Sequence, residues 1–141
     1  MSPANSKQIA PAGWRVPTDP DWNTLRDYLI ANGYNWDGTT IDNKVAKSTA
    51  AKTDWASSGG AGAIGNNIRE NNSSGFSALP GGCRSDDGGF DGRSFDAYWW
   101  SATEFGASHA WGRNLNQNPD YILRFYYFKG SGFSARLVRD T

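Results

Sequence analysis

Cysteine is almost missing from this 141-residue sequence, in which Cys83 stands alone. One cysteine cannot form a disulfide within the chain, so the fold must be held by its hydrophobic core. Cys83 follows two glycines, and we interpret it as a small buried hydrophobic residue and not as a reactive thiol.

An excess of charge of either sign is lacking too. Lys and Arg together number 14, and so do Asp and Glu. A neutral chain offers no basic surface to nucleic acid or to an anionic membrane. No apolar run approaches the roughly 20 residues that a bilayer span needs. We therefore expect neither nucleic-acid binding nor direct membrane insertion.

The first 12 residues are polar, are bounded by prolines and show no signal peptide. We expect residues 1–12 to be a flexible tail or a remnant of expression. Residues 13–141 are then predicted to form one domain, which is long enough to bury a real core.

Aromatic residues, by contrast, make up 14% of the chain, with seven tryptophans. Disordered chains have few aromatics and a high net charge, so we expect an ordered, loop-rich fold with a core of large rings. Because adjacent strand residues point to opposite faces, one of Trp99 and Trp100 is expected to be exposed. The tryptophans interpreted mainly as core residues are Trp14, Trp22, Trp55, Trp99, Trp100 and Trp111.

The first half of the chain carries helix signals. An extended segment over residues 13–17 leads to Thr18 or Asp19 as a cap and Pro20 as the first helical position. An apolar stripe of helical spacing then predicts a helix that stops at Asn32-Gly33. A weaker helix is predicted over residues 40–51, and a long loop over residues 57–74. The stripe of the first helix is Trp22, Leu25 and Leu29, and that of the second is Ile41, Val45 and Ala46.

The second half carries strand signals. Strands are predicted over residues 76–80, 98–103, 110–115, 121–129 and 133–139. Helices that come before antiparallel strands indicate an α+β fold. If one face of the strand over residues 121–129 is buried, about half of its side chains should be exposed.

Four blocks of sequence carry a family resemblance. They are Gly13–Thr18 with Trp22, Gly75–Gly82, Tyr98–Glu104 and Gly132–Asp140. In this order they resemble the Fibrobacter succinogenes major paralogous domain. The resemblance implies a C-type-lectin-like fold, with two helices, a mostly antiparallel sheet and long loops, that is related to the formylglycine-generating enzymes. It also implies a place on a bacterial or phage surface, because such domains occur in surface proteins and as variable proteins of diversity-generating retroelements.

In those retroelement systems, substitutions are scattered through a C-terminal segment, which here corresponds to residues 98–129. The composition of that segment suits recognition, since aromatic rings give large contact areas while small polar residues adapt their hydrogen bonds. We expect a non-catalytic module that binds a protein or glycan of a cell surface. The expected ligand-binding residues are Tyr98, Trp100, Phe105, Ser108, His109, Asn114, Asn116, Gln117, Asn118, Asp120, Tyr121, Tyr126 and Phe128.

Two other functions stay open. The chain could be a structural or adhesive domain of a bacterial surface protein, or a degenerate enzyme of the formylglycine-generating type. Those enzymes use a pair of cysteines, and this chain has one. His109 is the only histidine, and neither a nucleophile nor a carboxylate near it marks a catalytic triad.

Calcium is the one cofactor with candidate ligands, although the expectation is that no cofactor is needed. Asp86, Asp87 and Asp91 lie among glycines, with Asp96 further along. They do not match the EF-hand pattern, and the sugar-binding triplets of calcium-dependent lectins are missing. An Asp- and Gly-rich turn is the favoured interpretation.

Overall fold

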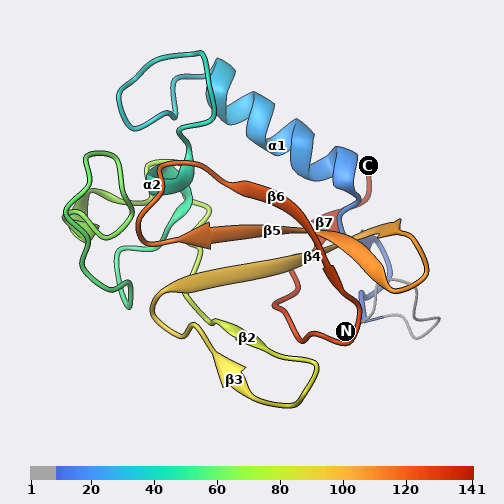
Figure 1. Ribbon diagram of the computed structural model, residues 1–141. Helices are drawn as coiled ribbons and strands as arrows, with labels where there is room; N and C mark the ends of the chain where they lie inside the picture. Colours follow the sequence, from blue (N-terminus) through green and yellow to red (C-terminus); the bar gives the residue numbers. More distant parts are fainter. Residues whose placement is uncertain (1–8) are drawn as a thin grey trace.

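The computed structural model describes residues 9–141 and shows an α+β fold (Figure 1). The predicted tail over residues 1–12 lies mostly outside the described residues. Between residues 9 and 141, no helix is both long and apolar enough to cross a membrane. The elements in chain order are β1 (Trp14–Arg15), α1 (Asp19–Ala31), α2 (Ala46–Thr49), the 3-10 helix η1 (Ile68–Glu70), β2 (Cys83–Arg84), β3 (Phe90–Asp91), β4 (Asp96–Phe105), β5 (His109–Asn116), β6 (Leu123–Phe128) and β7 (Val138–Arg139).

Helix α1 forms where the sequence predicts it, because its end signals are local. The side chain of Thr18 accepts a hydrogen bond from the backbone of Asp21, whose carboxylate accepts one from the backbone of Thr18. This capping box satisfies two of the free backbone donors of the first turn. At the other end, Gly33 takes a positive φ of 81° and ends the helix.

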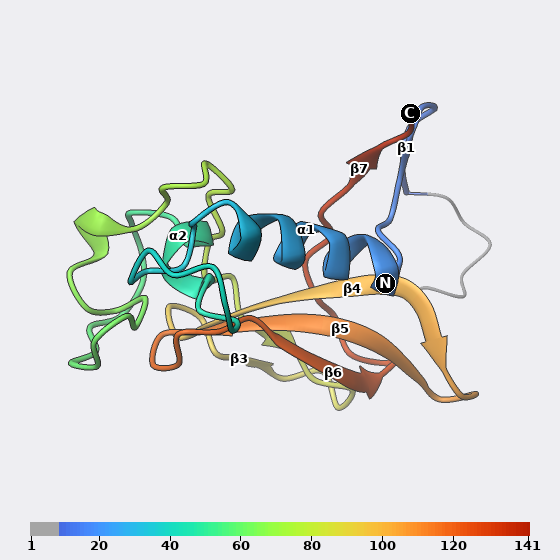
Figure 2. The same ribbon diagram turned by 90° about the horizontal axis from the view of Figure 1, so that it is seen from above.

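Strands β4, β5 and β6 form an antiparallel sheet in that order. The register between β4 and β5 shifts between Trp100 and Glu104, as at a β-bulge. Figures 1 and 2 show α1 lying along one face of this sheet. The chain ends meet in a separate two-stranded sheet of β1 and β7.

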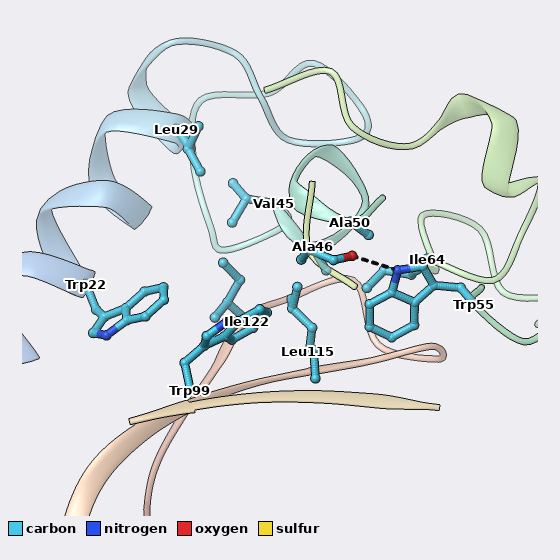
Figure 3. Close-up of a cluster of buried hydrophobic side chains, with 12 residues drawn as sticks. Trp22, Leu29, Val45, Ala46, Ala50, Trp55, Ile64, Trp99, Leu115 and Ile122 are labelled. Atoms are coloured by element: carbon cyan, nitrogen blue, oxygen red, sulfur yellow. Dashed lines mark hydrogen bonds between the residues drawn. The ribbon is translucent and has the colours of Figure 1, made fainter. Parts of the chain in front are cut away.

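The core lies between α1 and the sheet (Figure 3). Trp22 of α1 packs against Trp99 of β4, with 5.8 Å between ring centroids. Towards the other end of the sheet, Trp55 donates a hydrogen bond from Nε1 to the carbonyl of Ala78 over 3.0 Å. The other large buried residues are Leu29, Val45, Ile64, Leu115 and Ile122.

Three predicted elements are shorter than expected or missing. The predicted helix over residues 40–51 is reduced to α2, since Asp42 has a positive φ of 63° and Ile41 is exposed. No strand forms over residues 76–80, where Ser77 has a positive φ of 60°. The predicted closing strand over residues 133–139 pairs as a strand only at β7, with one isolated bridge from Ser134 to Trp99.

Two predictions about tryptophans are wrong. Trp14 is 44% exposed, because its short strand lies beside β7 away from the core. Trp99 and Trp100 are both buried, because both faces of β4 are covered. α1 covers Trp99, while Phe133 of the C-terminal segment stacks on Trp100 with 4.5 Å between centroids.

Candidate ligand-binding surface

Five aromatic side chains gather on one face of the sheet, where β4 turns into β5 and β6 ends. The strand register places Phe105 opposite His109, His109 opposite Phe128, and Trp111 opposite Tyr126. Phe105 stacks on Tyr126 with 4.1 Å between ring centroids, and His109 lies 4.3 Å from Phe128. We call the set Phe105, His109, Trp111, Tyr126 and Phe128 the aromatic cluster.

The aromatic cluster is open to solvent because α1 does not reach it. The helix begins at Asp19, beside Arg113 and Arg124, and runs from there towards the other end of the sheet. Beyond that start no element covers the sheet face among residues 9–141. Phe105 is therefore 42% exposed and Phe128 56% exposed. Large rings gathered in the open are a feature of interaction sites.

A buried ionic group borders the aromatic cluster. The carboxylate of Asp19 accepts hydrogen bonds from Nη1 of Arg113 at 2.8 Å and from Nη2 of Arg124 at 2.7 Å. Burial acts to raise the pKa of Asp19, but the hydrogen bonds from Arg124 and Arg113 outweigh it and leave this pKa below its usual value. Asp19 thus stays ionised and ties the start of α1 to β5 and β6.

The same ionic group positions Trp111. The guanidinium of Arg124 lies 3.6 Å from the centroid of the Trp111 ring, which is a cation–π contact. The sequence analysis interpreted Trp111 as a core residue and gave Arg124 no part in binding, so it missed both as parts of the surface. Their spacing carries the signal, because Trp111 follows His109 by two residues and Arg124 precedes Tyr126 by two, which puts each pair on one face.

Four of the predicted binding residues lie in the aromatic cluster, and Ser108 lies beside it. The prediction that about half of the side chains over residues 121–129 would be exposed is too low, since Ile122 is buried, Tyr127 and Lys129 are half-buried and the other six are exposed. In β6 only Tyr127 is half-buried, and the others are exposed on both faces. α1 does not cover Tyr126 and Phe128, while Leu123 and Phe125 face the opposite side. The cluster members that were predicted are Phe105, His109, Tyr126 and Phe128.

Three predicted binding residues pack inside the protein, so their prediction as ligand contacts is wrong. Tyr98 and Trp100 point to the opposite face of the sheet, where they stack on Phe133. Trp100 is completely buried, and burial raises the pKa of Tyr98 to about 12. Asn114 is 8% exposed and uses its amide to bond the carbonyl of Ala97 and the Asp96 carboxylate.

The remaining predicted residues lie at or beyond the far end of β5, about 17 Å from Trp111 and about 24 Å from His109 at strand rise. Their polar atoms are used to hold loops together. Asn118 accepts a hydrogen bond from Ser58, Asp120 accepts one from Nε1 of Trp36, and Asn116 donates one to Asp96. The prediction of one continuous surface is therefore wrong for Asn116, Gln117, Asn118, Asp120 and Tyr121.

His109 has a hydroxyl neighbour, since Oγ of Ser108 lies 2.9 Å from its Nδ1. A nucleophilic pair of this kind needs a third group to orient the imidazole. Within residues 9–141, no carboxylate hydrogen bond reaches the other ring nitrogen of His109. Cys83 lies on β2, and burial raises the pKa of its thiol, which opposes formation of a thiolate.

The calcium candidates do not converge. Asp87 accepts a hydrogen bond from the backbone of Gly89, and Asp91 from that of Gly92, as in Asp-Gly turns. In the part of the chain that the structure describes, no three His, Cys, Asp or Glu side chains come together as metal ligands. Asp86, Asp87 and Asp91 thus form no common site.

Comparison with known proteins gives one family. The sequence profile of the Fibrobacter succinogenes major domain matches residues 1–139, which is nearly the whole chain. No curated protein and no solved structure matches the chain.

Proposed function

The chain belongs to the Fibrobacter succinogenes major domain family, and from this premise we propose that it is a non-catalytic binding module. The aromatic cluster would be its contact surface, and a protein or glycan on another cell its ligand. The fold would be a variant of the C-type-lectin fold, displayed on a cell or virion surface. This proposal rests on one observation above others, the exposure of stacked rings on one sheet face.

The physics of the cluster suits recognition. Trp and Tyr supply rigid contact area at a small cost in side-chain entropy. Phe105, Tyr126 and Trp111 already contact one another, so their positions are fixed before a ligand arrives. Preorganised contacts of this kind reduce the entropic cost of binding.

The surface offers few groups for chemistry. Ser108 ends the turn between β4 and β5 and His109 begins β5, and no carboxylate of the described residues orients the imidazole. The aromatic faces are suited to stacking on a sugar ring or on apolar side chains of a protein. Recognition, and not catalysis, is the function that this arrangement supports.

A retroelement-diversified variable protein is the specific form that we propose. In that case the exposed positions of β5 and β6 would vary between copies, while Arg113 and Asp19 would not. The gene would lie near a reverse transcriptase gene and a template repeat of the segment for residues 98–129. A locus that lacks both would leave an adhesive domain as the better interpretation.

Binding of the fluorescently labelled domain to intact bacterial cells and to a glycan array tests the proposal. The variant Phe128→Ala should weaken binding about tenfold or more, as loss of a large contact ring does at interfaces. The matched control is Phe90→Ala, because Phe90 is 84% exposed but lies on β3, outside the cluster. Equal binding by both variants would remove the aromatic cluster as the contact surface. Protease and glycosidase treatment of the cells separates a protein ligand from a glycan.

A further inference from the structure

Among residues 9–141, no strand pairs with the outer edge of β6. The backbone N–H of Lys129 donates to the carbonyl of Ser108 over 2.9 Å, in the same register as the β5–β6 pairs. Because antiparallel residues alternate between bonded and non-bonded pairs, Tyr127, Phe125 and Leu123 bond β5. The backbone groups of Arg124 and Tyr126 and the N–H of Phe128 therefore point outwards, away from β5.

The free part of this edge has defined ends. At its start, the side-chain amide of Asn43 bonds both the N–H and the carbonyl of Ile122. At its end, the carbonyl of Phe128 accepts a hydrogen bond from the backbone of Ser131. Between them lies a short, exposed stretch rich in aromatics, which is a template for another strand.

We propose that β6 pairs with β6 of a second copy of this chain, in an antiparallel dimer with its twofold axis at Tyr126. Tyr126 then faces Tyr126 of the second copy, and Arg124 faces its Phe128. In this register the pairs Tyr126–Tyr126 and Arg124–Phe128 join residues whose backbone groups point outwards, and Phe125 lies opposite Tyr127 as a non-bonded pair between them. The dimer joins two sheets into one.

The side chains are complementary in this register. Arg124 meets an aromatic ring, which favours a cation–π contact, and Lys129 meets Leu123 of the second copy. An axis at Arg124 would set two like charges opposite each other, which destabilises a strand pair. The whole chain carries no net charge, so long-range repulsion does not oppose self-association.

The assembly closes at two copies. The opposite edge of the sheet, at β4, is already engaged by bridges from Ala97 to Gly82 and from Trp99 to Ser134. Each copy has one free edge in this sheet among its described residues, so a symmetric pair of these edges leaves no edge for a third copy. Since the axis is perpendicular to the sheet, both aromatic clusters face the same side. The inference that the two aromatic clusters act as one bivalent surface rests on the proposed function, whereas the inference of a dimer does not.

Sedimentation velocity over a concentration series tests the dimer on the whole chain. The wild type should shift from 15.4 kDa to twice that mass. Tyr126→Pro removes the outward N–H and spares the bonds to β5, as proline does on strand edges. Tyr126→Ala is its control, since it loses the same ring but keeps the N–H. The proline variant should dimerise about tenfold more weakly than the alanine variant.

A second pair of variants tests the register without touching the backbone. Phe128→Lys sets a cation opposite Arg124 of the second copy, and Phe128→Glu sets an anion there. The lysine variant should dimerise about fivefold to tenfold more weakly than the glutamate variant.

Four outcomes would overturn the proposal. They are a wild type that stays monomeric, an assembly larger than two, equal weakening by Tyr126→Pro and Tyr126→Ala, and equal effects of the two Phe128 variants. A monomer whose binding to cells is weakened more by Tyr126→Pro than by Tyr126→Ala would assign the edge to a strand of the ligand instead.

Discussion

Arg124 holds its guanidinium 3.6 Å from the ring centroid of Trp111 while its Nε and Nη2 atoms bond the carboxylate of Asp19. One side chain thereby joins the first turn of α1, the edge strand β6 and the aromatic cluster. Because Asp19 is buried and stays ionised, the position of Arg124 is fixed by the core. The ring that Arg124 covers is thus part of a rigid surface.

Replacing Asp19 with Asn should lower the free energy of unfolding by about 3 kcal/mol, since it leaves Arg113 buried without a counter-ion. Urea denaturation measures the change. The control is Asp27→Asn, because Asp27 pairs with Arg26 on the surface and should contribute less than about 1 kcal/mol. Similar losses in the two variants would contradict a special role for the buried ionic group.

Acid should remove the contribution of the ionised Asp19 carboxylate to the free energy of unfolding. The pKa of this carboxyl is lowered in the folded state, so its stabilisation is complete above the unfolded pKa of about 3.9 and is lost as the pH falls through the folded pKa. The stability difference between the wild type and Asp19→Asn should therefore shrink below about pH 4. Denaturation at a series of pH values measures it, and a difference that stays constant down to about pH 2 would contradict this assignment.

Replacing Lys47 with Met should loosen the long loop over residues 57–74. The buried Nζ atom donates to the carbonyl of Asn66, to that of Asn67 at 3.2 Å and to Oδ1 of Asn71 at 2.9 Å. Loss of the ammonium leaves these acceptors without a donor, so stability should fall by about 2 kcal/mol or more. Hydrogen exchange should speed up in this loop.

The control for Lys47→Met is Lys52→Met at an exposed position, which should change stability by less than about 0.5 kcal/mol. If exchange accelerates evenly through the chain in Lys47→Met, the loop is not the segment that the ammonium holds.

Replacing Gly62 with Ala should cost more than replacing Gly38. Both glycines have a positive φ, 75° and 76°, and so share the backbone strain of about 1 kcal/mol. A Cβ at Gly62 would lie 2.2 Å from Nε1 of Trp36, whereas one at Gly38 would meet open space. The extra loss should be about 1–3 kcal/mol, measured by thermal unfolding. Equal losses would show that Trp36 moves aside freely, although its Nε1 bonds Asp120.

Local sequence signals predicted the elements that depend on near neighbours. Helix α1 was predicted from its cap, its stripe and its terminal glycine, and strands β4 and β6 from runs of aromatic residues. The predictions over residues 40–51 and 76–80 failed at Asp42 and Ser77. Each takes a left-handed conformation, which non-glycine residues adopt rarely and which the residue type alone did not reveal.

The composition predicted the segment that contains the candidate site, and the strand topology showed which residues of that segment face outwards. Residues 98–129 contain the aromatic cluster, as the resemblance and the abundance of rings led us to expect. The sequence did not reveal that Trp100 and Asn114 face inwards, or that the loop of Asn118 lies at the other end of the sheet. Strand alternation assigns a side chain to a face but does not say what covers that face.

The sequence by itself determined the family, the α+β class, the capped helix and the concentration of aromatic rings in the C-terminal half. These follow from local periodicity, capping and residue type, which act over a few positions. Only the tertiary structure decided which rings are exposed. That outcome depends on where α1 begins over the sheet and on Phe133 covering the opposite face, contacts between residues far apart in the chain.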